Sequence, residues 1–271
     1  MKNLMVFISQ IKDFYAEYGT LAKIQIDNSL DLGWRREDII LATNFEFEYN
    51  GVKSIVVSDD NFVLYCPVNS KFKAILELFE RGIFNKDNLY WFHDLDASQA
   101  EVITESELAM GEADMALTDY AWRDKWNTGS FFFTSNAKDI FEAIVQTQDL
   151  LMLQDEKALM LLTNKFTKEE NERLNHSFDS ETIKRIPIIK DVERRIKNIN
   201  TSYNFVPFAD IKHCWEVALK PIRVVHFRPH SGFPRRLIPS LLNFYMYGMN
   251  DINTVLMPER LIKIYQQHGI K

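Results

Sequence analysis

The 271-residue sequence predicts an α/β domain with a mixed, mainly parallel central sheet flanked by helices, followed by a helical C-terminal extension. Three observations predict this fold class. Short apolar runs alternate with segments whose apolar residues recur at helical spacing. Polar residues directly follow several of these runs, as they do where parallel strands deliver ligand-binding groups to one sheet edge. Hydrophobic residues make up 46% of the chain, which is enough for a sizeable core.

The predicted strands are short apolar runs bounded by polar or turn-forming residues. They cover residues 4–8, 38–44, 52–57, 88–92, 129–134 and 222–227. Helical spacing predicts helices near residues 72–79, 137–151 and 155–166. Because strands and helices alternate, we expect helices to cover the sheet on both faces.

We expect one domain over residues 1–235 and a helical tail over residues 236–271 that packs on it. Charged residues and Asn dominate an insert at about 165–200, which is predicted to be a solvated helical excursion. A role in acceptor binding or in forming an oligomer is the alternative. The aromatic residues of the tail are expected to pack on the domain.

Composition excludes several classes of protein. The net charge of −6 does not favour nucleic-acid binding, which normally requires a basic face. Cys66 and Cys214 lie far apart, which excludes a disulfide scaffold or a thiolate zinc site and suits a reducing compartment. No run of about 18 apolar residues is present, so we expect no transmembrane segment. We interpret the apolar N-terminus as a strand and not a signal peptide, and predict a cytoplasmic location.

The motif Asp94-Leu95-Asp96 directly follows a predicted strand. Residues i and i+2 point the same way on an extended chain, so both carboxylates can face one ion. Two hard oxygen ligands suit Mg²⁺ or Mn²⁺, and such an ion can offset the charge on a departing nucleoside diphosphate. An acidic turn without metal is the alternative. His93 should point the opposite way and is not counted as a ligand.

Four segments occur in a characteristic order along the chain: 91–96, 126–133, 154–159 and 224–227. The first looks like the DxD motif that ends a core strand, and the second like a later strand carrying Asn and Gly. The third looks like a "D-Q/E-x-x-L" helix start, and the fourth like a late strand ending in His-Phe. Together they resemble the nucleotide-sugar glycosyltransferases of the GT-A (Rossmann-like) fold, and most nearly the retaining galactosyl- and glucosyltransferases.

The resemblance implies a metal-dependent transferase that moves a sugar from a nucleotide-sugar, expected to be a UDP-sugar, to a glycan or other hydroxyl acceptor. It also implies a third metal ligand, His226, beside Asp94 and Asp96. Imidazole is a reasonable partner for two carboxylates around Mn²⁺. His230 is the reserve candidate for this ligand.

Three residues are candidates for contact with the donor sugar or the reacting centre. Asn127 precedes Gly129, and its amide can donate to and accept from sugar hydroxyls. Asp155 and Glu156 begin a helix, and the resemblance implies that one of them faces the sugar or the reacting centre. In an inverting enzyme that residue would be the base, and in a retaining one it would position or stabilise the sugar. A turn Asn and dipole-favoured helix-start acids are the alternatives.

The nucleotide is expected to lie against the first strands and to meet basic residues. Phe7, Ser9 and Asn44 are candidates for contact with the base. Lys73 and Arg228 are candidates for contact with the diphosphate, beside Lys71 and the pair Arg235-Arg236. Two further segments are interpreted less sharply: residues 25–34 as part of the donor pocket, and residues 118–123 as an acceptor platform or core packing.

Two rival functions use the same residues. A nucleotidyltransferase or phosphohydrolase could use the Asp94 and Asp96 metal site, but these enzymes often carry a Gly-rich phosphate loop. The segment 9–19 holds a single Gly. The other rival is a non-catalytic carbohydrate-binding protein. The presence of all four candidate site residues argues against it: Asp94, Asp96, Asn127 and His226.

Overall fold

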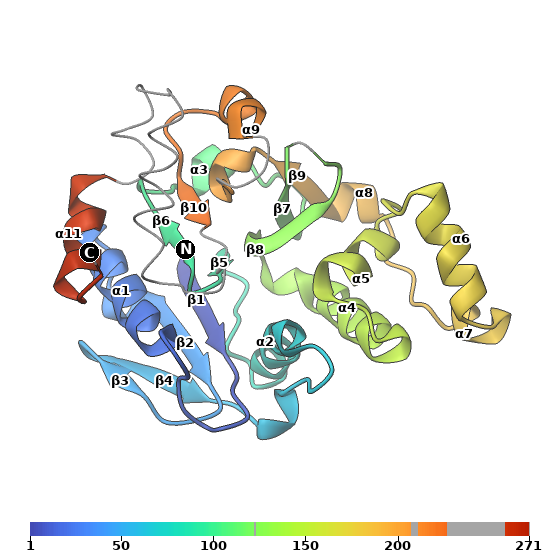
Figure 1. The fold of residues 1–271 in the computed structure, drawn as a ribbon, viewed down its shortest axis with the longest axis horizontal. Helices are drawn as coiled ribbons and strands as arrows, with labels where there is room; N and C mark the ends of the chain where they lie inside the picture. Colours follow the sequence, from blue (N-terminus) through green and yellow to red (C-terminus); the bar gives the residue numbers. More distant parts are fainter. Residues whose placement is uncertain (122, 207–210, 227–257, 271) are drawn as a thin grey trace.

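The protein is seen here in a computed structural model that describes residues 1–121, 123–206, 211–226 and 258–270. An eight-stranded sheet forms the centre, in the order β3-β4-β2-β1-β5-β8-β7-β9 (Figure 1). Its parallel half consists of β4 (Val52–Val56), β2 (Ile39–Thr43), β1 (Lys2–Phe7) and β5 (Tyr90–His93). Strand β8 (Trp126–Phe133) runs antiparallel to both β5 and β7 (Met115–Asp119), and β3 (Glu48–Tyr49) is antiparallel to β4. The predicted fold class, a mixed and mainly parallel sheet flanked by helices, is confirmed.

Helices cover both faces of the sheet because successive side chains of a strand point to opposite faces. Leu4 and Val6 of β1 pack in one core with α2 (Ser70–Glu80), α4 (Lys138–Leu151) and α5 (Asp155–Leu162). Met5 and Phe7 pack in the other with α1 (Tyr18–Asp31) and α11 (Glu259–Gln267). The carboxyl ends of β1 and β5 therefore open between two helical layers.

Helix α1 is the largest element that periodicity did not predict. Its buried face includes Gln25, Asn28 and Ser29 beside apolar residues, so the apolar spacing that marks a helix is interrupted. The predicted strand at 129–134 is also longer than expected, because β8 begins at Trp126.

The late strand is placed differently from the prediction. The sequence suggested a core strand over residues 222–227, whereas β10 (Val224–His226) pairs antiparallel with β6 (Ala97–Gln99) in a separate two-stranded sheet. In this register His226 lies opposite Ala97, directly after the acidic motif. Phe227 lies outside the described residues.

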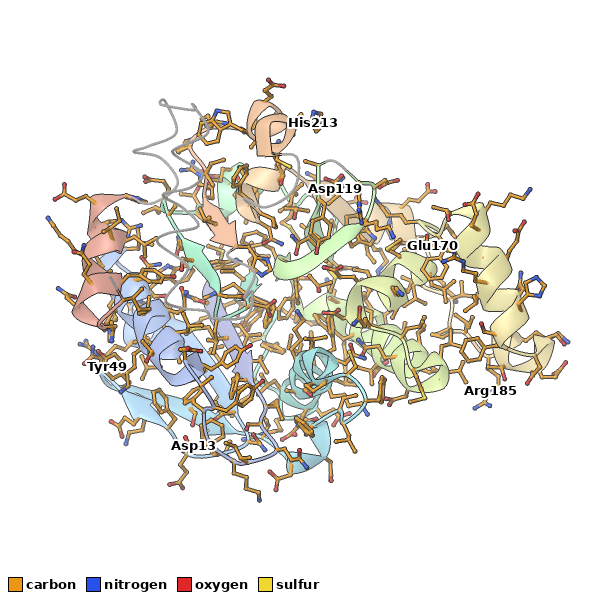
Figure 2. All side chains as sticks on the ribbon, in the orientation of Figure 1. Asp13, Tyr49, Asp119, Glu170, Arg185 and His213 are labelled. Atoms are coloured by element: carbon orange, nitrogen blue, oxygen red, sulfur yellow. The ribbon has the colours of Figure 1, made fainter. Side chains whose placement is uncertain are left out.

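The charged insert is helical for most of its length, with α6 (Lys168–Ser177), α7 (Ser180–Lys184) and α8 (Val192–Arg195). It then returns to the sheet as β9 (Ile196–Ile199), which pairs in parallel with β7 and was not predicted. In Figure 2, Glu170 and Arg185 of the insert lie at the opposite end of the molecule from Tyr49. Two shorter helices are α3 (Glu105–Leu108) and α9 (Ile211–Val217).

Of the predicted tail, residues 258–270 are described. They contain α11, which packs beside α1 (Figure 1). The aromatic residues Phe244, Tyr245 and Tyr247 lie outside the described residues. Among the described residues, none of the helices combines the length and apolar character needed to cross a bilayer.

Candidate active site

The acidic motif turns sharply after β5. The backbone N–H of Asp94 donates to the carbonyl of Gly129 at 2.8 Å, and the carbonyl of Asp94 accepts from the N–H of Ala97 at 2.9 Å. One ligand atom each from Asp94, Asp96 and His226 lies within 4.8 Å of the other two. The structure thus brings together the three side chains that the sequence suggested as metal ligands.

The imidazole of His226 is held between β6 and β8. Its backbone N–H donates to the carbonyl of Phe205 at 2.8 Å, and its Nε2 lies 3.4 Å from Oδ1 of Asp96. Nδ1 is buried and has no hydrogen-bond partner in the part of the chain that the structure describes. An unpartnered buried ring nitrogen beside two carboxylates fits a site for Mn²⁺ or Mg²⁺.

Gly129 makes this arrangement possible. A Cβ built on Gly129 would lie 2.0 Å from Cε1 and 2.3 Å from Nδ1 of His226. These separations are far below van der Waals contact, so the imidazole occupies the space that any side chain at position 129 would need. Glycine is therefore required at position 129 by the close approach of the His226 side chain.

His93 is buried and turned away from the three ligands. Its Nε2 lies 2.9 Å from Oδ1 of Asn3, and its Nδ1 lies 3.0 Å from the carbonyl oxygen of Asp94. Burial lowers the pKa of His93 to about 4. This residue supports the loop main chain.

Lys71 bridges two carboxylates inside the site. Its Nζ lies 3.2 Å from Oδ1 of Asp94 and 3.1 Å from Oδ2 of Asp155, and it donates to the carbonyl of Thr128 at 3.0 Å. Burial alone would lower the pKa of Lys71, but Asp94 and Asp155 outweigh it and raise that pKa above its usual range. The ammonium is therefore a fixed positive charge next to the candidate metal ligand Asp94.

Asp155 and Glu156 begin α5 but have different partners. Oδ2 of Asp155 accepts from the hydroxyl of Thr128 at 2.7 Å and pairs with Lys71. Glu156 accepts a hydrogen bond from the hydroxyl of Tyr120. Burial, together with the charge of Asp155, raises the pKa of Glu156 to about 7. Asp155 is thus an ion-paired carboxylate, whereas Glu156 can exchange a proton near neutral pH.

A cavity of about 520 Å³ joins these groups, within the range of about 300–1,000 Å³ that is usual for small-molecule sites. Aromatic side chains contribute to its lining: Tyr15 and Tyr18 pack on Phe7, with ring centroids 5.4 and 5.0 Å from that of Phe7. Polar side chains line it as well, namely Lys71, Asp94, Asp96, Thr128, Asp155, Glu156 and His226. The lining can therefore contact both a flat ring and charged or hydroxylated groups of a ligand.

Of the residues suggested for nucleotide binding, Phe7 lines this cavity, while Ser9 and Asn44 do not. The amide of Asn44 accepts from the N–H of Ser9 at 2.9 Å and donates to its carbonyl at 2.8 Å. The same amide donates to Asp59 at 2.9 Å. These polar groups bond to one another and support the loop after β1, outside the lining of the cavity.

Lys73 lies outside the cavity and pairs with Asp149 at 3.0 Å. Asn127 is buried, and its Oδ1 accepts from the N–H of Gly129 at 3.1 Å, while the neighbouring Thr128 lines the cavity instead. The remaining basic and imidazole candidates fall outside the described residues: Arg228, His230, Arg235 and Arg236.

The segment 25–34 does not line the cavity, contrary to the expectation from its polar composition. Gln25 instead donates to the carbonyl of Leu95 within the acidic motif, and Asn28 donates to the carbonyl of Gln99 in β6. Three cavity residues were not predicted from the sequence: Tyr15, Tyr18 and Thr128. Alternation along β8 could have identified Thr128, because Asn127 and Thr128 must face opposite sides of the strand.

Comparison with known proteins adds structural likenesses only. A scan against protein-family models gives no match, and no curated protein is similar in sequence. Galactosyltransferase LgtC in complex with donor and acceptor sugar analogs is 12% identical over 97% of this chain and 100% of that chain, with a TM-score of 0.48. A glycosyltransferase involved in glycosylation of the major capsid of PBCV-1 is 13% identical over 91% and 100% of the two chains, with a TM-score of 0.47.

Mouse xyloside xylosyltransferase 1 is also similar, with 13% identity over 84% of this chain and 97% of that one, and a TM-score of 0.42. These three solved structures are sugar transferases. At such low identity and TM-score, the function of this chain has to be argued from its own site.

Proposed function

We propose that this chain is a divalent-metal-dependent glycosyltransferase that moves a sugar from a nucleotide-sugar, a UDP-sugar in the first instance, to a hydroxyl acceptor. One observation carries the proposal. The ligand atoms of Asp94, Asp96 and His226 converge within 4.8 Å in a cavity that is also lined by aromatic side chains. These two kinds of group suit the diphosphate and the base of such a donor.

The aromatic side chains of the cavity suit the nucleotide base. The rings of Phe7, Tyr15 and Tyr18 give an apolar surface on which a flat base can stack. Phe7 ends β1, so a base stacked there would lie next to the carboxyl ends of the parallel strands, where open α/β sheets bind their ligands. From there the diphosphate would reach the metal ligands.

Mn²⁺ or Mg²⁺ held by Asp94, Asp96 and His226 would offset the negative charge that develops on the departing nucleoside diphosphate. Lys71 adds a positive charge that is already fixed in the absence of ligand. The same lysine holds Asp155 in one orientation, and the hydroxyl of Thr128 holds it from a second direction. Asp155 is thus prepared to accept hydrogen bonds from sugar hydroxyls in a fixed geometry.

We assign the proton-transfer or charge-stabilising role at the reacting centre to Glu156. Its carboxyl lines the cavity, and its pKa of about 7 suits a group that gives or takes a proton at neutral pH. Asp155 fits this role less well, because its carboxylate is committed to Lys71 and Thr128. The anomeric outcome of transfer follows from where the acceptor hydroxyl enters relative to Glu156.

Calorimetric titration of the protein with UDP and with GDP, each in Mn²⁺ and in EDTA, tests the proposal. We expect binding of UDP that depends on Mn²⁺. Asp96→Asn should weaken that binding by more than about 100-fold, because even second-shell changes around a metal cost about 10–100-fold. Asp87→Asn is the matched control, since Asp87 is exposed and lies outside the cavity.

Binding that is equal in Mn²⁺ and EDTA, or no binding of either nucleotide, would contradict the proposal. The products of slow donor hydrolysis in Mn²⁺ separate the rival chemistry. A transferase releases UDP and free sugar, whereas a nucleotidyltransferase or phosphohydrolase acting on the diphosphate releases UMP and sugar-1-phosphate.

A further inference from the structure

Helix α1 holds the main chain of the metal-binding loop with side-chain amides. The amide of Gln25, which is buried, donates to the carbonyl oxygen of Leu95 at 2.9 Å and to the hydroxyl of Ser98 at 2.8 Å. Leu95 lies between Asp94 and Asp96, so this bond fixes the peptide that joins the two proposed ligands. Both hydrogens of the Gln25 amide are thereby used.

The C-terminal helix α11 reaches the same loop. The hydroxyl of Tyr265 lies 2.7 Å from the hydroxyl of Ser98, and both groups are buried. Burial raises the pKa of Tyr265 above its usual range, so its hydroxyl stays protonated at any working pH. Tyr265, Ser98, Gln25 and the carbonyl of Leu95 therefore form one continuous hydrogen-bonded chain.

A second contact from α11 supports the strand that follows the loop. The guanidinium of Arg260 donates to Oδ1 of Asn28 at 2.8 Å and to the carbonyl of Gln99 at 3.3 Å. The amide of Asn28 donates to the same carbonyl at 3.0 Å. These bonds hold β6 at Ser98 and Gln99. Strand β10 pairs with β6, and in that pairing His226 lies opposite Ala97.

We infer that α11 positions the metal site from outside it, and that Tyr265 and Gln25 are positioning residues for Asp94 and Asp96. The inference rests on the proposed function, because it concerns the affinity of that site for its cation. The relay is built from neutral groups, so it can fix the loop without changing the charge of the site. Residues near the end of the chain would then control metal binding near its middle.

The physical reason is geometric. Two carboxylates and an imidazole bind one ion tightly only when their ligand atoms converge, and groups behind the ligands commonly change metal affinity by about 10–100-fold. Loss of the Tyr265 hydroxyl leaves the Ser98 hydroxyl held by the Gln25 amide without its partner on α11, so Ser98 and that amide can shift together. The donor to the carbonyl of Leu95 is then less firmly fixed, and the separation of Asp94 and Asp96 can vary.

The test is a titration of Mn²⁺ in saturating UDP, in which electron paramagnetic resonance measures the free ion. Tyr265→Phe and Ser98→Ala should each raise the Mn²⁺ dissociation constant by about tenfold, and the double variant by no more than the larger single effect, because both break one chain. Tyr49→Phe is the matched control. Its hydroxyl donates at 2.9 Å to Asp27, which lies on α1 as Gln25 does. Tyr49 lies near the outer edge of the molecule (Figure 2).

Thermal unfolding of the same variants separates positioning from stability. We expect Tyr265→Phe and Tyr49→Phe to lower Tm by similar amounts while only Tyr265→Phe changes the Mn²⁺ affinity. Unchanged Mn²⁺ affinity in both Tyr265→Phe and Ser98→Ala would overturn the inference and leave the proposed function standing. A wild-type protein that retains no Mn²⁺ in the presence of UDP would overturn both. Should Tyr265→Phe fail to fold, the smaller Ser98→Ala change gives the same decision.

Discussion

Helices α1 and α2 pack on opposite faces of β1 and reach the same acidic loop by different chemistry. The buried face of α2 is apolar, with Phe72, Ile75 and Leu78, and its first turn sends in one charge, Lys71. The buried face of α1 includes the amides of Gln25 and Asn28, and it sends in hydrogen bonds to carbonyl oxygens. Helix α2 thus contributes a positive charge to the site, whereas α1 fixes the position of its main chain.

The difference shows how two requirements are kept separate. A cation next to the carboxylates must be held firmly, because burial disfavours it unless opposite charges surround it. The apolar face of α2 provides that anchorage. Amide donors add no net charge, so α1 can fix Leu95 and Gln99 without competing with a metal ion for the carboxylates. Substitutions on the two helices should therefore differ in how they change unfolding free energy and Mn²⁺ affinity.

The largest effect is expected from Lys71→Met. Removing the ammonium leaves Asp94 and Asp155 without their shared partner, and breaking a buried ion pair typically costs about 3–5 kcal/mol of unfolding free energy. Urea unfolding of the metal-free protein measures this loss. Adding Mn²⁺ and UDP should recover part of it, since the ion neutralises Asp94 but not Asp155.

Lys73→Met is the matched control for this change. Lys73 lies on the same helix and pairs with Asp149 at the surface, where an ion pair contributes about 1 kcal/mol or less. Equal losses of unfolding free energy in the two variants would show that the Lys71 bridge is no stronger than a surface pair.

Leu78→Ala tests the apolar side of α2. The side chain is fully buried, so truncation should cost about 2–5 kcal/mol of unfolding free energy from lost packing and the cavity left behind. The folded fraction should still bind Mn²⁺ with wild-type affinity, which the resonance titration measures. A loss of affinity comparable with that of Tyr265→Phe would break the division of roles between the two helices.

The smallest effect concerns α5, which combines a paired acid with a proton-exchanging one. Burial and Asp155 raise the pKa of Glu156 from 4.5 to about 7 in the folded protein. The folded state then keeps a proton that the unfolded chain has released, so this group's contribution to stability falls as pH rises from about 4.5 to about 7. Glu156→Gln should remove that fall, which urea unfolding of the metal-free protein across this pH range would detect.

Glu169→Gln, an exposed residue of α6, is the control and should follow the wild-type profile. Parallel pH profiles for wild type and Glu156→Gln would show that Glu156 titrates as an ordinary surface acid. Its assignment as the proton-transfer group would then lose its support.

The same two helices show what the sequence could and could not predict. Apolar residues at helical spacing identified α2, while the buried amides of α1 interrupt that spacing and concealed a helix of similar importance. The strand-end rule depends only on local order, and the residues that it selected after β5, Asp94 and Asp96, line the cavity. Ser9 and Asn44, which it also selected, do not line the cavity, because their polar groups bond to each other and to Asp59.

The sequence offered two lysines of one helix as candidates for the site. Lys71 and Lys73 are two residues apart on a helix, about 200° around its axis, so only one could enter the site. The sequence favoured Lys73, and the structure places Lys71 inside the cavity. His226 was named from motif order, but its position depends on the pairing of β10 with β6, which joins segments that are more than a hundred residues apart. Long-range pairing of that kind leaves no local signal.

Gly129 offers a simple way to re-engineer this protein. Because the imidazole of His226 fills the volume of a side chain at position 129, alanine there must displace the histidine, whose atoms are the nearest to the added Cβ. Such a variant would keep most of the residues that line the cavity but lose the position of one of the three proposed metal ligands. A single methyl group would then separate metal binding from the other properties of the cavity.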